Sequence, residues 1–212
     1  VCQTNLGGAI HGAGRLDEAA QLMVDALARY ERTLGLEHPH ALLALETLGF
    51  IRQDQGLMKE AEELFRRLVD ARRRILGEHN PRTIAALSSL FVPLERRGAL
   101  AEAETVARSV LEGRRATLGP EHGMVNYAQS TLALVLMDRG PERRAEANEL
   151  AQSTYRDALR LYGPRHDLTV RAAEALALSL RARGQPDEGH KILTEALAAA
   201  EGKISPHIVA AA

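Results

Sequence analysis

The sequence of 212 residues contains one cysteine, no tryptophan and only 3% aromatic residues. The single cysteine, Cys2, cannot form a disulfide within the chain, and no charged and apolar leader pattern precedes it. We therefore expect a reducing, cytoplasmic setting. Strand-rich folds use β-branched and aromatic residues, whereas alanine and leucine dominate here and favour closely packed helices. The composition predicts an all-helical protein.

The chain also lacks an excess of charge of one sign and lacks any long hydrophobic run. Its formal net charge is -1, so no strong field attracts a polyanion such as nucleic acid. No apolar run reaches the roughly 18 residues that a membrane-spanning helix needs. The 45% hydrophobic content is nevertheless enough to build a sizeable core. We expect a folded protein that has neither nucleic acid nor a membrane as its partner.

Glycine recurs at a fixed interval along the chain. It stands every 42 residues and then after 44, at Gly14, Gly56, Gly98, Gly140 and Gly184. A Leu-Gly pair keeps the same period, at residues 34–35, 76–77 and 118–119, and Tyr162-Gly163 follows after 44. The two extra residues fall in Pro141–Arg144, which predicts a loop because loops tolerate insertions. Two markers with one period predict a tandem array of repeats.

Each repeat predicts two helices. In the second repeat, the first helix carries an apolar stripe of Leu45, Leu48 and Gly49 and ends at Gly56. The second helix carries a stripe of Ala61, Leu64, Phe65 and Leu68, and Asn80-Pro81 then caps and begins the next helix. The predicted helix pairs are 2–13 with 16–34, 39–55 with 57–76, 81–97 with 99–118, 122–139 with 142–162, and 165–183 with 185–201. Pro93 predicts a kink in the third pair because it removes the hydrogen bond to the Ser89 carbonyl.

One helix pair cannot bury both of its faces, so the repeats must stack on one another. The predicted fold is a single all-α domain, a right-handed superhelical solenoid of about five repeats. The repeats are expected at 1–35, 36–77, 78–119, 120–163 and 164–203, with 204–212 as a tail or the start of a further helix. Because the pattern begins part-way through a helix at Val1, we expect a fragment of a longer protein. The only lysines are Lys59, Lys191 and Lys203. This bias is typical of a GC-rich, bacterial genome.

The linker Leu34-Gly35-Leu36-Glu37-His38-Pro39 and the 42-residue period resemble the kinesin-light-chain type of tetratricopeptide repeat. The resemblance implies small residues where the two helices of a pair cross. In the first helices these are Gly7, Gly49, Ala133 and Ala177, while Phe91 departs from the pattern. In the second helices they are Ala19, Ala61, Ala103, Ala147 and Gly189. The resemblance also implies binding of a protein or peptide in a concave groove.

The groove of this family is lined by the first-helix stripe next to the buried one. By position, the partner-binding residues expected here are Asn5, His11, Leu43, Glu46, Phe50, Gln53, Asp54, Ser88, Val92, Arg96, Tyr127, Leu134, Met137, Asp138, Glu174, Leu178 and Arg181. Their apolar members form an exposed track, or alternatively pack between adjacent first helices. Of the family's paired groove asparagines only Asn5 is present, with Thr47, Ser89, Thr131 and Ala175 at the second positions. Partnership with kinesin is therefore not inferred.

Other polar clusters have simpler interpretations than chemistry. His38, His122 and His166 occupy one linker position in different repeats, about 10 Å apart by packed-helix spacing, which favours helix capping over a metal site. Groove carboxylates interspersed with arginines are typical of a solvated face, and no catalytic motif accompanies them. We expect no enzyme activity, no metal and no cofactor. Two alternatives to groove binding stay open, namely self-association through the end repeats and a ligand-sensing regulatory domain.

Overall fold

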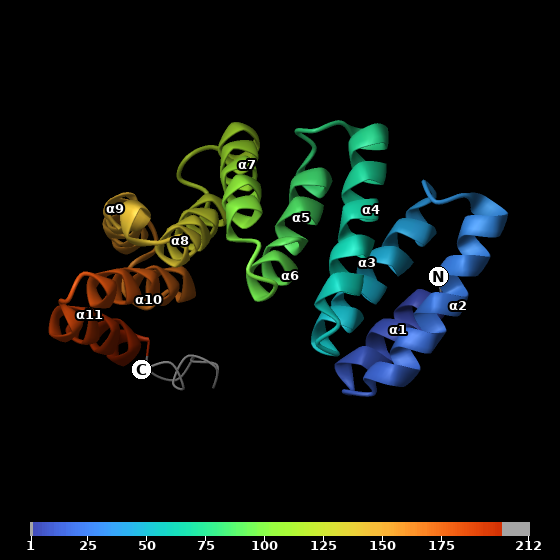
Figure 1. Ribbon diagram of the computed structural model, residues 1–212, viewed down its shortest axis with the longest axis horizontal. Helices are drawn as coiled ribbons and strands as arrows, with labels where there is room; N and C mark the ends of the chain where they lie inside the picture. The colour runs from blue at the N-terminus through green and yellow to red at the C-terminus, as the bar shows by residue number, and fades with distance from the viewer. Residues whose placement is uncertain (1, 201–212) are drawn as a thin grey trace. The chain divides into compact units, whose positions relative to one another are not determined.

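The computed structural model describes residues 2–200, and its helices follow the repeat pattern of the sequence (Figure 1). The chain divides into two compact units, an N-terminal unit of residues 1–106 and a C-terminal unit of residues 107–212. The helix α7 (Leu100–Leu118) runs across the division. No helix described between residues 2 and 200 is long and apolar enough to cross a membrane.

In the N-terminal unit, successive helices pack against one another as hairpins. The helices are α1 (Cys2–Gly12), α2 (Leu16–Leu34), α3 (Pro39–Asp54), α4 (Met58–Leu76), α5 (Pro81–Ser89) and α6 (Phe91–Arg96). The first helices α1 and α3 also touch each other, so the repeats stack as expected. The largest fully buried side chains include Leu45, Ile51, Phe65 and Leu68, which lie on the predicted apolar stripes or directly beside them.

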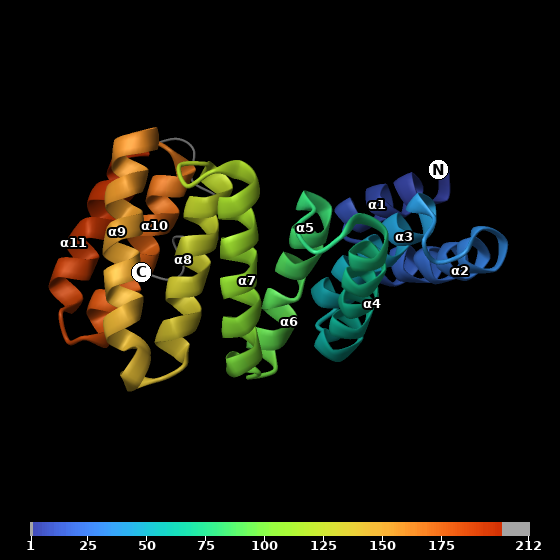
Figure 2. The ribbon, with the colours of Figure 1, turned by 90° about the horizontal axis from the view of Figure 1, so that it is seen from above.

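The C-terminal unit repeats this arrangement. Its helices after α7 are α8 (Gly123–Asp138), α9 (Arg144–Tyr162), α10 (Asp167–Ala182) and α11 (Pro186–Ala199), and Figure 2 shows them running side by side. The first helices α8 and α10 are in direct contact, and α9 and α11 each pack on α10. Ala133, Ala151, Leu176 and Leu180 form a buried cluster at their centre.

The predicted helix boundaries agree with the structure within a few residues, except in the third repeat. There the continuous helix expected at 81–97 is wrong, because it is divided into α5 and α6 at Leu90. The kink itself is the one predicted, since Pro93 cannot donate to the Ser89 carbonyl and the helix bonding resumes only after the break. The two extra residues of the fourth repeat form part of a short 3-10 turn, η1 (Pro141–Arg143). The expected tail at 204–212 lies outside the described residues.

Side chains cap four of the first helices. The His38, His122 and His166 Nδ1 atoms accept the N–H of the residue two positions later, at 3.2, 3.1 and 3.1 Å. Asn80 Oδ1 accepts the Arg82 N–H at 2.9 Å in the same way. Since each cap satisfies a backbone donor that lacks a helical partner, the predicted capping role of these linker residues is confirmed.

Removing one such cap has a predictable effect on stability. Asn80→Ala leaves the Arg82 N–H without its side-chain acceptor, so we expect the free energy of unfolding to fall by about 1 kcal/mol. Urea unfolding followed by circular dichroism measures this change. Asn80→Asp keeps the acceptor oxygen and is the matched control, and equal losses in both variants would contradict the capping role.

Small residues stand where the paired helices cross. A Cβ atom added at Gly49 would lie 2.5 Å from Phe65 Cε1, and one at Gly189 would lie 2.7 Å from the Ala177 carbonyl oxygen. Both glycines were predicted to allow this close approach, and the structure confirms it. The expected left-handed end at Gly56 is also present, with φ of 78°.

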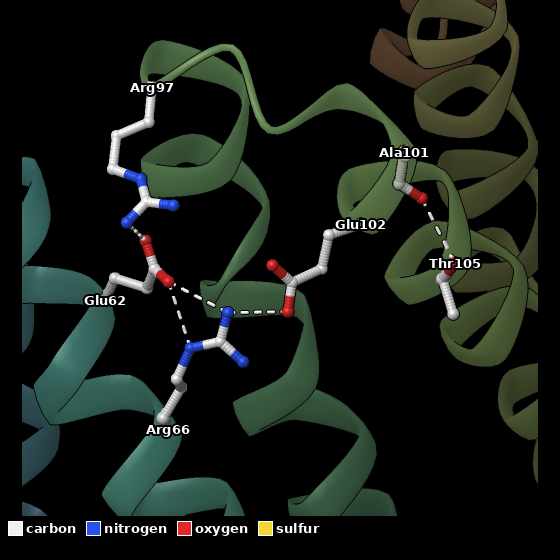
Figure 3. A network of polar contacts seen from close by, with 6 residues as sticks. All are labelled: Glu62, Arg66, Arg97, Ala101, Glu102 and Thr105. Carbon is white, nitrogen blue, oxygen red and sulfur yellow. Dashed lines mark hydrogen bonds and ion pairs between the residues drawn. The ribbon is translucent and has the colours of Figure 1, made fainter.

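A polar network joins second helices of consecutive repeats in the N-terminal unit (Figure 3). Glu62 is only 5% exposed. Its carboxylate oxygen Oε1 accepts hydrogen bonds from Arg66 Nε and Nη2 at 3.0 and 2.8 Å. Its other oxygen lies 3.0 Å from Arg97 Nη1. Arg66 Nη2 also donates to Glu102 Oε1 at 2.5 Å, and this bond raises the pKa of Arg66. In the C-terminal unit, Arg108 and Glu146 repeat the last of these contacts at 2.6 Å.

Candidate functional site

The groove stripe of the N-terminal unit is partly apolar and partly occupied by internal polar pairs. On α3, Leu43 and Phe50 are 42% and 37% exposed. The Phe50 ring meets the buried Phe65 ring edge-on, with centroids 5.1 Å apart, which holds its exposed edge in place. His11 Nε2 of α1 lies 2.6 Å from Asp54 Oδ2 of α3. The structure thus brings together two residues that the sequence predicted separately.

The remaining predicted residues of this unit differ in their exposure to solvent. Asn5 and Arg96 are exposed, while Gln53, Ser88 and Val92 are half-buried. Val92 belongs to α6, beyond the break that follows α5.

A cleft of about 530 Å³ opens between α3, α4 and α5 in this unit. Among the predicted groove residues, Leu43 and Glu46 line it. The rest of its lining comes from the linker, the start of α3, the last turns of α4 and the start of α5, namely Glu37, Pro39, Leu42, Arg72, Ile75, Leu76, Arg82 and Ala85. The α4 residues were missed because the family's groove is built from first helices. The available signal was the aliphatic Ile75 at the end of the second helix, where the first and third repeats have Thr33 and Thr117 and the fourth has Leu161.

A buried ion pair forms one wall of the cleft. Arg72 Nη2 and Nη1 donate to Glu46 Oε2 and Oε1 at 2.7 and 3.1 Å, and Nη1 also donates to the Arg82 carbonyl at 3.1 Å. The Arg72 side chain is only 11% exposed. Glu46 is therefore not part of a solvated face, as the sequence suggested, but a structural partner of α4. A planar guanidinium held on both oxygens fixes the spacing of α3 and α4.

In the C-terminal unit the stripe carries an arginine stacked on a tyrosine. Tyr127 of α8 is 40% exposed, and the Arg171 guanidinium carbon of α10 lies 4.0 Å from its ring centroid. Arg171 Nη2 also donates to Thr131 Oγ1 at 3.3 Å. These contacts tie adjacent first helices together and leave the ring edge accessible.

The other predicted residues of the C-terminal unit are less accessible than an exposed track requires. The half-buried members are Leu134, Met137, Glu174 and Leu178, and the exposed ones are Asp138 and Arg181. The apolar members of the predicted track therefore differ in accessibility. Phe50 and Tyr127 are exposed, whereas Val92, Leu134, Met137 and Leu178 are partly covered.

Asp138 provides a test of the groove's electrostatics. Neighbouring protein atoms displace water from its carboxyl group, which raises the pKa of Asp138 above its ordinary value of 3.8. The folded chain then binds this proton more tightly than the unfolded chain. Its ionisation therefore lowers stability as pH rises through the interval between the ordinary and the raised pKa, and the loss persists at neutral pH.

Asp138→Asn cannot ionise at this position. We expect the stability of the variant relative to wild type to be greater near about pH 7 than near about pH 3, where both chains are uncharged at this residue. Urea unfolding at the two pH values measures the difference. An unchanged difference between variant and wild type would contradict the raised pKa.

The arrangement offers no metal centre in the part of the chain that the structure describes. No group of three or more His, Cys, Asp or Glu side chains between residues 2 and 200 is placed to hold a metal ion. The linker histidines each use Nδ1 for a helix cap, which gives them a structural role.

Comparison with known proteins identifies the repeats. A model of the tetratricopeptide repeat matches residues 1–40, 42–82 and 94–123, which is more than half of the chain. The chain belongs to the tetratricopeptide-repeat family. No curated protein sequence matches it. As a tetratricopeptide-repeat protein, it belongs to a class whose members generally act as protein-interaction modules, and the comparisons identify no specific partner.

Solved structures show the same fold over nearly the whole chain. The nearly identical TPR-like repeats from Podosopora anserina, assigned to a kinesin light chain, superpose with a TM-score of 0.81 at 25% identity, covering 96% of each chain. A variant of these repeats gives a TM-score of 0.83 at 25% identity and covers 93% of this chain and 92% of its own. BtubC (BKLC) from P. vanneervenii is 16% identical, with a TM-score of 0.77 and coverage of 95% of this chain and 80% of that one. The predicted fold class, an all-α tetratricopeptide-repeat solenoid of the kinesin-light-chain type, is confirmed.

Proposed function

We propose that this tetratricopeptide-repeat domain binds a peptide segment of a partner protein along its first-helix stripe. The supporting observation lies in the N-terminal unit, where Leu43 and Phe50 of α3 are 42% and 37% exposed at stripe positions. Fully burying one such side chain contributes roughly 1.5–3 kcal/mol, so a partner that covers both of them gains useful affinity. Exposed apolar side chains gathered on one surface are typical of a contact site.

Binding fits the polar groups of the stripe better than catalysis does. Glu46 is held by Arg72, and Asp54 lies against His11, so neither carboxylate is poised as an acid or base for a substrate. Because internal partners already account for these two carboxylates, we infer a non-enzymatic role for the stripe. We infer a regulatory or scaffolding role in a bacterial cytoplasm, a setting supported by the lone Cys2 and the scarcity of lysine.

The test begins with a library of random short peptides displayed on phage and selected on the immobilised chain. The selected peptides are synthesised, and their affinities are measured by fluorescence anisotropy. We expect the double variant Leu43→Ala/Phe50→Ala to weaken binding at least about tenfold, because each truncation removes apolar area that the peptide would bury. Charge reversal of Glu46 or Asp54 is a poorer test, since it would break the pairs with Arg72 and His11.

The matched control removes equally exposed apolar side chains from second helices. Val24 of α2 and Leu159 of α9 are 37% and 36% exposed. The double variant Val24→Ala/Leu159→Ala should leave peptide affinity unchanged. Equal losses in both double variants, or a loss only in the control, would move the binding site away from the stripe.

Self-association through the end repeats is the alternative function, and it can be tested on the same purified chain. Light scattering over a range of protein concentrations distinguishes the two. A mass that stays that of the single 23.1 kDa chain, together with stripe-dependent peptide binding, supports the proposal. A mass that rises with concentration, with no peptide selected, would instead indicate an assembly module.

A further inference from the structure

The cleft between α3, α4 and α5 exists because one repeat position holds a small residue. Leu43, Ala85, Tyr127 and Arg171 occupy equivalent places in the first helices of successive repeats. Three of these side chains are large, and Ala85, which is exposed, leaves the space unfilled at the start of α5. The structure therefore has a hollow at this repeat that the repeat pattern itself does not require.

The walls of the hollow are aliphatic and already exposed. Leu43, Ile75 and Leu76 line it and are 42%, 43% and 37% exposed. At the position of Ile75 the first and third repeats have threonine, Thr33 and Thr117, and the fourth has Leu161. A volume of about 530 Å³ lies in the range of ligand pockets and holds an aliphatic side chain together with its flanking backbone.

Among the described residues around the hollow, two arginines are paired with carboxylates and a third is not. The Arg72 guanidinium is satisfied by Glu46, and Arg74 Nε lies 3.3 Å from Glu37 Oε1 at the linker. The Arg82 side chain lines the same cleft, and no carboxylate between residues 2 and 200 is paired with it. An apolar hollow beside an available guanidinium is complementary to a ligand that carries an aliphatic group next to an anion.

We propose that this cleft takes an aliphatic side chain of the bound peptide, and that an acidic residue beside that side chain pairs with Arg82. The inference rests on the proposed peptide-binding function and specifies the kind of segment that is bound. Burial of the aliphatic group supplies affinity, whereas the carboxylate sets the position of the peptide along α3 and α5.

The proposal is tested with the same displayed peptide library, selected on the full chain. We expect the selected peptides to share an aspartate or glutamate adjacent to leucine, isoleucine, valine or methionine. Ala85→Tyr places at this position the residue that the next repeat already carries at Tyr127, so the helix tolerates it while the hollow is filled. We expect this variant to weaken binding of such a peptide at least about tenfold.

A charge exchange identifies the role of Arg82. Arg82→Glu should weaken binding of an acidic–aliphatic peptide about threefold to tenfold, because an attractive exposed pair becomes a repulsive one. Replacing the acidic residue of the peptide by lysine should restore binding to this variant and weaken binding to wild type. Only a direct contact between the two charges produces this reciprocal pattern.

The outcomes separate this inference from the function on which it rests. Peptides that lack the acidic–aliphatic pair, or that bind Ala85→Tyr as tightly as wild type, would overturn the cleft assignment. If those peptides still lose affinity in Leu43→Ala/Phe50→Ala, stripe binding stands and only the cleft assignment fails. If the affinity of those peptides is unchanged both by Ala85→Tyr and by Leu43→Ala/Phe50→Ala, the proposed function fails as well.

Discussion

Replacing Gly49 by alanine is expected to lower the free energy of unfolding by about 1–3 kcal/mol, although alanine is the better helix former. The added Cβ would lie 2.5 Å from Phe65 Cε1 and 2.9 Å from its Cδ1. Phe65 is fully buried, and Phe50 packs edge-on against it, so the ring has no free space to enter. The strain therefore exceeds the gain of up to about 1 kcal/mol in helix propensity.

Two further variants make this first prediction specific, with urea unfolding as the measurement. Gly8→Ala is the control, because a Cβ at Gly8 of α1 meets nothing within 4 Å. We expect that variant to be unchanged or slightly more stable. Phe65→Leu removes the ring edge that the new methyl group meets, so Gly49→Ala should cost less in the Phe65→Leu background than alone. Additive losses would contradict the proposed clash.

The second large effect is expected at the buried carboxylate of the polar network. Glu62→Ala removes the acceptor for Arg66 and the ion-pair partner of Arg97, and should cost about 1–3 kcal/mol. The lower part of this range applies because both arginine side chains are partly exposed, at 43% and 37%, and can regain water. Glu102 stays bonded to Arg66, which limits the damage to one side of the network (Figure 3).

An exposed ion pair between α9 and the turn before α8 is the matched comparison for Glu62. Arg160 lies 3.0 Å from Glu121, with side chains 58% and 65% exposed. Glu121→Ala should leave the unfolding midpoint within experimental error, and added salt should not change that result. Similar effects of the two substitutions would show that burial of Glu62 contributes nothing to stability.

Much of the fold was predictable because residues within each repeat mark where its helices begin and end. Gly56 ended the first helix of the second repeat and Asn80 capped the first helix of the third, and each acts through contacts within a few residues in sequence. The kink at Pro93 was equally local, since it follows from one missing N–H group. Such features depend on chain geometry alone, and repetition along the sequence made them unambiguous.

The site was less predictable because it depends on contacts between distant residues. The register placed Leu43 and Glu46 on one face of α3, but it could not show that Arg72 of the next helix would reach Glu46. Likewise, His11 and Asp54 were assigned to the same groove without any signal that they touch. Long polar side chains choose partners by the distance between packed helices, and helix periodicity does not record that distance.

The most direct test of the central claim is to map a selected peptide on the isotope-labelled chain by amide chemical-shift changes. Binding along the stripe of the N-terminal unit predicts changes on the exposed faces of α3 and α5, with the largest ones near Leu43, Ala85 and Phe50. Amides of the second helices α2 and α9 around Val24 and Leu159 should be unaffected. Chemical-shift changes that are concentrated on those second helices, with none on the first helices, would contradict binding along the stripe.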